Sequence, residues 1–397
     1  MSDLLVSRAV HIPDPLRIGR YRRAPEFGPR LLFFSGGTAL NNISRRLKSY
    51  THNSIHLVTP FDSGGSSAQL RHAFDMPSIG DLRSRLMALA DEAITGHPEI
   101  YLLFNYRLPK KGSCTELAAQ LDDIVGSKSP LMNDISNPMR RLIRSQLEHF
   151  RDAMPADFDL RGASIGNLIL AGGYMGNHQH LEPILFLFSK LVNVLGTVRA
   201  VVNSSLQLGA ELDDGSEVIG QHLLTGKEAP PLASPIRELF LSSRSDKRVP
   251  VEAVLRKKTQ KLIDQADLVC YPPGSFYTSL MANLLPRGVA SAIAANDCPK
   301  VYIPNRGNDP EQIGMNARTA VDRLLDCLRT DAGRNTSSEK FLNFVLLDDR
   351  DRAPMADLSE KFLRQRGIQA VRTRLVTKES APYYDPDLLV STLLSLT

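Results

Sequence analysis

The stretch that decides the fold is Leu31-Leu32-Phe33-Phe34-Ser35-Gly36-Gly37-Thr38. Four consecutive apolar residues that end at Ser, Gly and Thr are typical of a strand buried on both faces. Leu40, Ile43 and Leu47 then recur at the spacing of one helix face. A buried strand, a glycine turn and a helix open a doubly wound, Rossmann-like α/β fold with a mostly parallel sheet.

The alternation of strands and helices continues along the chain. Residues 208–220 predict a small β-hairpin that turns at Asp214-Gly215, a pair that favours tight hairpin turns. Residues 112–159 are polar, charged and interrupted by proline, so we expect a helical insertion on the surface. The other predicted strands are 55–58, 198–202, 267–271, 301–303, 344–347 and 370–375, and the predicted helices are 78–93, 160–175, 181–195, 251–265, 317–328, 358–366 and 387–396.

Composition places the chain among ordinary globular proteins. It has 397 residues, of which 42% are hydrophobic and 23% are charged. No apolar run approaches the roughly 20 residues that span a bilayer, and residues 1–30 lack the apolar segment of a signal peptide. We expect residues 1–27 to be a basic arm on the surface and residues 28–397 to be one α/β domain.

The cysteines and the overall charge exclude several classes of protein. The four cysteines are widely spaced, so we expect free thiols, a cytoplasmic location and no zinc site. The net charge is +5, but acidic residues are interspersed throughout, aromatic residues are only 6% and tryptophan is absent. Nucleic-acid binding is disfavoured, because it would need a clustered basic face with stacking aromatics. A small ligand that carries phosphate explains the local basic residues equally well.

Three glycine turns follow predicted strands: Gly36-Gly37-Thr38, Gly64-Gly65-Ser66-Ser67 and Gly274-Ser275. In an open parallel sheet, ligands bind beyond the carboxyl ends of the strands. Glycine lets the backbone approach a ligand closely, and the helix after each turn presents N–H groups at its positive end. Together the turns predict a cradle for a diphosphate. The Walker A and GxGxxG patterns are absent, which disfavours P-loop kinase and standard dehydrogenase chemistry.

Charged residues near these turns have two interpretations each. Asp62 is either a Mg²⁺ ligand or acceptor for a substrate hydroxyl, or else an aspartate that closes an Asx-turn. Asp81 either faces the ligand or is an ordinary acid in a first helical turn. Arg83 either binds a phosphate bidentately or pairs with a neighbouring carboxylate.

Uncharged residues extend the candidate site. Asn167 lies in an apolar helix, where a buried amide must either face the ligand or bond to a neighbouring loop. Tyr277 and Thr278 begin a helix after Gly274, and Tyr277 either stacks on a base or packs in the core. No nucleophile and base stand out as a pair, so hydrolysis through a covalent intermediate has little support.

Short stretches spread over residues 30–397 resemble motifs of the CofD/YvcK superfamily, both in their amino acids and in their order along the chain. The stretches are Phe34–Thr38, Asp62–Ser67, Gly80–Arg83, Gly166–Leu168, Ala210–Gly215, Ala266–Val269, Pro273–Ser279 and Tyr384–Pro386. One branch of that superfamily is 2-phospho-L-lactate transferase, which moves a phospholactyl group from a nucleotide-diphosphate carrier onto a deazaflavin alcohol with Mg²⁺. The other branch is the YvcK-like gluconeogenesis factor, which binds nucleotide sugars or dinucleotides.

The resemblance implies a nucleotide diphosphate, nucleotide sugar or dinucleotide as ligand, with Mg²⁺ at Asp62. The ligand residues that we assign include Ser63, but the family commonly has a second aspartate at that position. YvcK-like chains often carry a histidine where Ala163 stands, so we expect a divergent member. The leading hypothesis is a CofD-like, Mg²⁺-dependent transferase, and the alternative is a non-catalytic YvcK-like sensor. Whether the chain is an enzyme stays open, as does its oligomeric state, for which a homodimer is one alternative.

Overall fold

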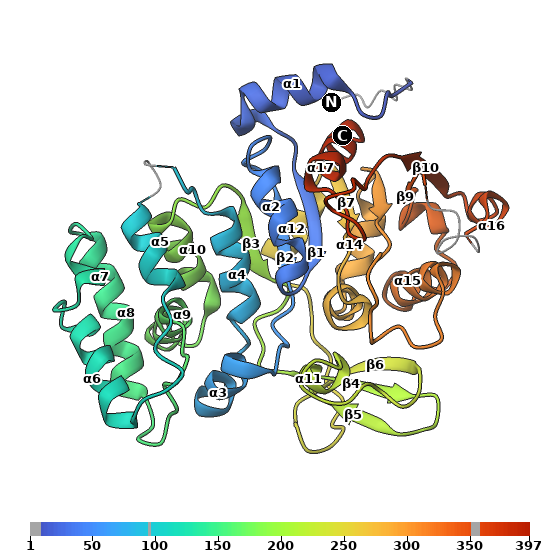
Figure 1. Ribbon diagram of the computed structural model, residues 1–397. Coiled ribbons are helices and arrows are strands. Elements are labelled where there is room, and N and C mark those ends of the chain that lie inside the picture. Colours follow the sequence, from blue (N-terminus) through green and yellow to red (C-terminus); the bar gives the residue numbers. More distant parts are fainter. Residues whose placement is uncertain (1–8, 94–96, 351–357) are drawn as a thin grey trace.

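The computed structural model describes residues 9–93, 97–350 and 358–397. Its centre is a seven-stranded sheet in which every neighbouring pair is parallel (Figure 1), in the order β10-β9-β8-β7-β1-β2-β3. The strands are β1 Leu31–Ser35, β2 Ile55–Val58, β3 Thr197–Ala200, β7 Leu268–Tyr271, β8 Lys300–Tyr302, β9 Phe344–Asp348 and β10 Gln369–Thr373. The α/β fold expected from the sequence is therefore confirmed.

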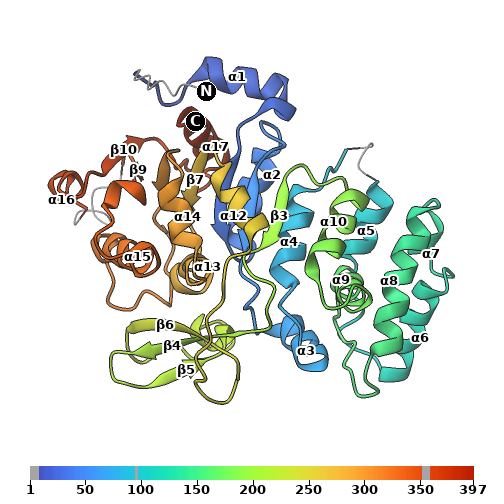
Figure 2. The same ribbon diagram turned by 180° about the vertical axis from the view of Figure 1, so that it is seen from behind.

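The apolar run of β1 is buried on both faces. Leu31 and Phe33 point into one hydrophobic core, and Leu32 and Phe34 point into another. Helices α2 (Asn41–Leu47), α4 (Gly80–Leu89) and α17 (Pro386–Ser395) lie side by side over the first face. The opposite face, in front in Figure 2, is covered by α12 (Lys257–Asp264), α13 (Ala282–Leu284), α14 (Val289–Ala295) and α15 (Ala317–Ala332), with α16 (Glu360–Arg364) near the edge.

The strand order changes direction at β1. From β1 the chain builds outward through β2 to β3, and after β7 it builds outward on the other side of β1 through β8, β9 and β10. The crossovers after β1 and after β7 therefore leave the sheet in opposite directions. This separation opens a crevice beyond the carboxyl ends of the two strands, which is where ligands bind in such sheets.

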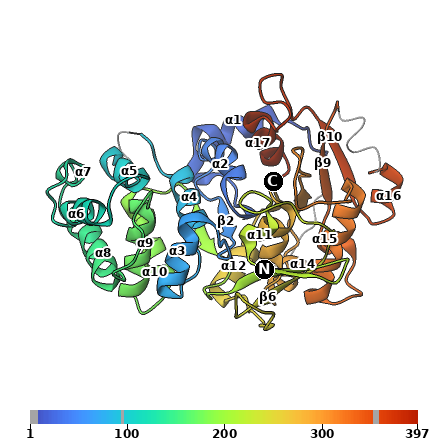
Figure 3. The same cartoon turned by 60° about the horizontal axis from the view of Figure 1, so that its bottom comes forward.

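A small antiparallel sheet lies beyond that edge of the large sheet (Figure 3). The hairpin predicted for residues 208–220 forms β4 (Gln207–Leu212) and β5 (Glu217–Ile219), and the turn contains Gly215 at φ +84. A third strand that we had not predicted, β6 (Ile236–Ser242), pairs with β4. Helix α11 (Gln221–Leu224) follows β5 and brings the chain back toward the crevice.

The helices between β2 and β3 form a lobe with its own core. Residues 112–159 fold as helices, but their apolar faces are buried against α9 rather than only lying on the surface. The two backbones come so close that a Cβ at Gly172 would lie 1.8 Å from the Gln146 carbonyl oxygen. The lobe contains α5 Pro98–Asn105, α6 Cys114–Val125, α7 Pro130–Asn133, α8 Met139–Ala153, α9 Ile165–Gly176 and α10 Leu181–Leu191.

The N-terminal segment is helical where it is described. Helix α1 (Pro15–Arg23) packs on α17: the Asp14 amide donates to Ser395 Oγ at 2.8 Å, and Arg17 donates to the Ser395 carbonyl at 3.1 Å. The first eight residues of the predicted arm lie outside the described residues. The remaining elements are α3 (Gly65–Phe74), a π-helix (Phe276–Met281) and 3-10 helices at Pro25–Phe27, Thr38–Leu40 and Ser338–Lys340.

Candidate ligand-binding crevice

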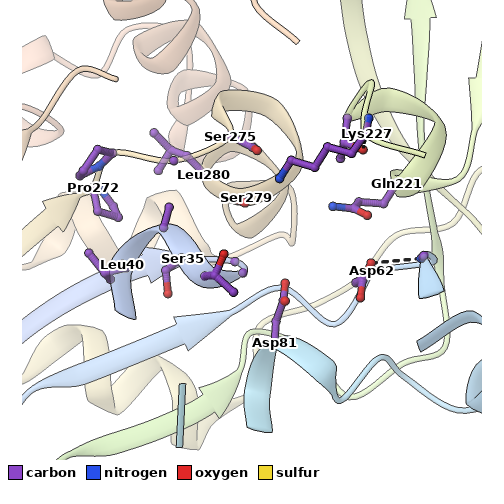
Figure 4. A pocket seen from close by; sticks show the side chains of 18 of the residues that line it. Ser35, Leu40, Asp62, Asp81, Gln221, Lys227, Pro272, Ser275, Ser279 and Leu280 are labelled. Atoms are coloured by element: carbon purple, nitrogen blue, oxygen red, sulfur yellow. Dashed lines mark hydrogen bonds between the residues drawn. The ribbon is translucent and has the colours of Figure 1, made fainter. Parts of the chain in front are cut away.

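A crevice of about 290 Å³ lies beyond the carboxyl ends of β1 and β7. Four segments line it (Figure 4): residues 34–40 after β1, residues 62–64 with Asp81 from α4, residues 221–228 after β5, and residues 272–280 after β7. The predicted site residues that line it are Gly36, Gly37, Thr38, Asp62, Gly64, Asp81, Gly274 and Ser275. All three glycine turns thus reach one cavity.

Hydrogen bonds from Arg85, a residue that the sequence analysis does not identify, hold the turn after β1 in place. Arg85 is fully buried and donates to the carbonyl oxygens of Gly36 at 3.3 Å and Gly37 at 3.0 Å, and to Ser44 Oγ at 2.7 Å. Burial lowers the pKa of Arg85 to about 10, so the guanidinium stays charged at neutral pH. The amides of Gly36 and Gly37 make no hydrogen bond to any residue in the described part of the chain.

Two carboxylates face each other across the second turn. Asp62 Oδ1 accepts from the Gly64 amide at 3.1 Å, so an Asx-turn is present, while the side chain still lines the crevice. Asp81 sits in the first turn of α4 and also lines it. Burial, and then the negative charge of Asp62, raises the pKa of Asp81 to about 7.

The segment after β5 closes the side of the crevice opposite Asp81, and sequence reasoning missed it. Ser63 Oγ lies 2.8 Å from His222 Nδ1, which ties α11 to the second turn. The Gly65 amide donates to Glu228 Oε2 at 3.3 Å. Figure 4 shows Lys227 and Gln221 reaching into the crevice from this segment.

The turn after β7 differs from the expected cradle. Gly274 and Ser275 line the crevice, but the amides at the start of the π-helix already have acceptors. The Phe276 amide donates to Asp309 at 2.8 Å, and the Tyr277 and Thr278 amides donate to Glu311 at 3.0 and 2.8 Å. This end of the helix therefore does not present free N–H groups to a ligand.

Tyr277 and Thr278 themselves point away from the crevice. The Tyr277 hydroxyl donates to the Ile236 carbonyl at 3.4 Å and contacts Met315 Sδ at 3.2 Å. Thr278 Oγ1 donates to Glu311 at 2.5 Å. Both side chains are buried, and Tyr277 lines a second cavity of about 410 Å³ beside β6 and α15. The structure thus gives these two residues positions in the core of the protein.

Arg83 and Asn167 are not among the residues that line the crevice. Arg83 donates to the Phe104 carbonyl at 3.4 Å, and burial, then the neighbouring Arg107, lowers its pKa to about 10. Asn167 is buried and donates to Ser66 Oγ at 3.3 Å, so it contacts the first turn of α3. Ser67 is also buried there, against Gly80.

Comparison with known proteins identifies the family. Residues 31–376 match the family model described as 2-phospho-L-lactate transferase CofD, which is most of the chain. The chain belongs to the CofD family. A gluconeogenesis factor from Bacillus subtilis is 28% identical to this CofD-family chain over 375 residues, 93% of the chain and 98% of the relative. Another from Listeria monocytogenes is 29% identical over 282 residues, 70% of the chain and 67% of the relative.

Solved structures share the fold. A protein of the UPF0052 family from Bacillus halodurans has a TM-score of 0.66 against this CofD-family chain at 23% identity, over 92% of the chain and 99% of that protein. No helix among the described residues is long and apolar enough to pass through a membrane.

The crevice suits a divalent cation only if a ligand helps to hold it. No group of three or more His, Cys, Asp or Glu side chains that could bind a metal occurs among the described residues. Asp62 and Asp81 supply two carboxylates, and Mg²⁺ is commonly held by one or two carboxylates together with substrate phosphates and water. In this CofD-family chain Asp81 therefore offers the second carboxylate that Ser63 does not.

Proposed function

We propose that the crevice binds a nucleotide diphosphate, nucleotide sugar or dinucleotide together with Mg²⁺, and that the protein transfers a phosphate-linked group from such a donor. The observation that carries the proposal is that Asp62 and Asp81 share one cavity with the amides of Gly36 and Gly37, which have no acceptor among the described residues. Free amides at a strand-to-helix turn bind phosphate oxygens. The two carboxylates repel a phosphate unless a cation lies between them.

The roles of the residues follow from their positions. Asp62 and Asp81 would hold the cation, which would neutralise charge on the diphosphate oxygens. Lys227 reaches toward the same space and would contact a phosphate directly. In the transfer, an acceptor hydroxyl oxygen attacks the outer phosphorus, the P–O–P bridge breaks, the nucleoside monophosphate leaves and the hydroxyl proton passes to solvent or a carboxylate. Positioning and charge neutralisation would supply most of the rate enhancement.

Ligand binding tests this proposal directly. Thermal shift and calorimetry would compare GDP, a UDP-sugar and NAD, each with Mg²⁺ and with EDTA. We expect a Mg²⁺-dependent shift that Asp62→Asn abolishes, because the amide keeps the hydrogen bond to Gly64 but loses the charge. Asp134→Asn, an exposed change of the same type, serves as the control.

Two outcomes would count against the transferase. Binding that is indifferent to EDTA and to Asp62→Asn would support a non-catalytic sensor instead. No binding of any of these ligands would contradict the assignment of the crevice. The cytoplasmic location and the homodimer stay predictions.

A further inference from the structure

We propose that residues 226–231 form a cover over the crevice that the ligand displaces, with the Glu228 carboxylate occupying a phosphate position until the ligand arrives. The inference deepens the proposed function and rests on it. It assigns to Glu228 a regulatory role, competition with the ligand, and to Lys227 the role of retaining the phosphate once Glu228 has moved.

Glu228 makes the contact that an anionic ligand would make. Its Oε2 accepts from the amide of Gly65, the first residue of the ten-residue helix α3. That amide has no acceptor within the helix, and negative charge is favourable at this end of the helix dipole. A Cβ at Gly64 would lie 2.8 Å from Glu228 Oε1, so the glycine lets the carboxylate come this close.

The charges in the crevice show why Glu228 must leave. Asp62, Asp81 and Glu228 all line it, whereas Lys227 is the one lysine or arginine among its described lining residues. A cation held between Asp62 and Asp81 would offset those two charges but would leave Glu228 facing the ligand. A phosphate and a carboxylate competing for the same amide repel each other at close range.

A second, independent observation points to a ligand in the same cavity. Ser35 lines the crevice and is 4% exposed, yet its Oγ has no hydrogen-bond partner among the described residues. Buried hydroxyl groups are nearly always hydrogen-bonded, so an unpartnered one at the end of β1 marks a position that a bound ligand or water satisfies.

The residues before the cover are held in place by burial and hydrogen bonds, whereas the cover itself has few such contacts. Leu224 is fully buried, Thr225 Oγ1 donates to the His222 carbonyl at 3.0 Å, and His222 is tied to Ser63. Beyond this anchor, Gly226 has φ +63, a conformation that glycine adopts without strain. Glu228 is exposed, so the free energy needed to swing its side chain away from the Gly65 amide is small, while Lys227 stays at the crevice.

Calorimetry with inorganic pyrophosphate in excess Mg²⁺ tests the inference. Glu228→Gln keeps the size and the acceptor oxygen but removes the charge, so we expect about fivefold tighter binding than in the unmodified protein. Lys227→Met should weaken binding by a similar factor. Glu238→Gln, an exposed change on β6 outside the crevice lining, should leave the affinity unchanged and controls for net charge.

The outcomes separate this inference from the proposed function. If the unmodified protein binds but Glu228→Gln binds equally or more weakly, the cover is wrong and the proposed function stands. If no variant binds pyrophosphate or a nucleotide diphosphate, the proposed function itself fails. Hydrogen exchange provides a test without any variant: pyrophosphate should increase exchange in residues 226–229, the part of the cover before Pro230 and Pro231, and slow it at residues 64–67. Slower exchange in both segments would overturn the displacement.

Discussion

The Glu311 carboxylate accepts a hydrogen bond of 2.8 Å from the amide of Thr278, which ties the loop after β8 to the segment after β7. The same side chain also accepts from the Tyr277 amide and from Thr278 Oγ1, and it is only 1% exposed. Asp309 binds the neighbouring amide of Phe276. One wall of the crevice is therefore positioned by buried acids of this chain and does not depend on a ligand for its shape.

The first prediction concerns stability and pH at Glu311. Burial, and then the charge of Asp309, raises the pKa of Glu311 to about 7 from an ordinary value of 4.5. The folded protein thus holds this proton more tightly than the unfolded chain does. The resulting stabilisation is complete below the ordinary pKa and is lost as the pH rises through the folded-state pKa near 7.

Glu311→Gln isolates that effect, because glutamine cannot ionise but keeps an acceptor for the two amides. We expect the free energy of unfolding of the variant, relative to that of the unmodified protein, to rise by roughly 1–3 kcal/mol when the pH is raised from about 5 to about 8. Urea unfolding at the two pH values measures the difference. Glu238→Gln corrects for general charge effects, and a constant difference at both pH values would contradict the prediction.

The second prediction concerns Arg85. Arg85→Met removes the donors to Gly36, Gly37 and Ser44 and leaves two carbonyl oxygens without their buried partner. We expect a loss of roughly 3 kcal/mol in the free energy of unfolding. Pyrophosphate binding should also fall, because the turn would no longer be held in place.

The matched control for that experiment is Arg45→Met. Arg45 is exposed on α2 and donates only to Asn42 among the described residues, so its removal should cost well under about 1 kcal/mol. Similar losses for the two variants would show that the buried hydrogen bonds of Arg85 do not determine the geometry of the turn.

The third prediction concerns the free energy of unfolding that the protein loses because Asp81 is close to Asp62. Asp81 is partly buried next to Asp62, and both the burial and the like charge disfavour its ionised form. Asp81→Asn should therefore raise the free energy of unfolding by about 1 kcal/mol in EDTA at about pH 8. The same variant should lose the Mg²⁺-dependent shift with GDP. Destabilisation in EDTA, measured against Asp134→Asn, would argue that Asp81 has a structural role.

Local signals in the sequence were enough to predict the elements around β1. The apolar run 31–34 and the glycines after it are short-range features, and the burial of both strand faces follows from them. Arg85 had a local signal that we did not use: it lies four residues after Asp81, on the same side of α4, whereas Arg83 lies two residues away and faces the helical lobe.

Residues that reach the crevice through tertiary contacts could not be predicted in this way. Glu228 contacts Gly65 although it lies 163 residues further along the chain, and residues 225–235, between α11 and β6, contain no strand or helix. The acceptors Asp309 and Glu311 also belong to a separate loop, 33 and 34 residues after the amides of the π-helix that they bind. A glycine turn in the sequence indicates where a backbone can approach a ligand, but not whether its amides are still free.

The last prediction concerns the contact between the turn after β1 and the π-helix after β7. A Cβ at Gly36 would lie 2.4 Å from Ser279 Oγ and 2.9 Å from Ser279 Cβ, so Gly36→Ala must displace the π-helix. We expect a loss on the order of 2 kcal/mol in urea unfolding. Ser279→Gly removes both of those atoms, so the double variant should recover part of the loss. On α1, a Cβ at Gly19 would meet no atom of the described residues within 4 Å, so Gly19→Ala should be neutral or stabilising. Purely additive effects of Gly36→Ala and Ser279→Gly would show that Gly36 and Ser279 of the π-helix are not in contact.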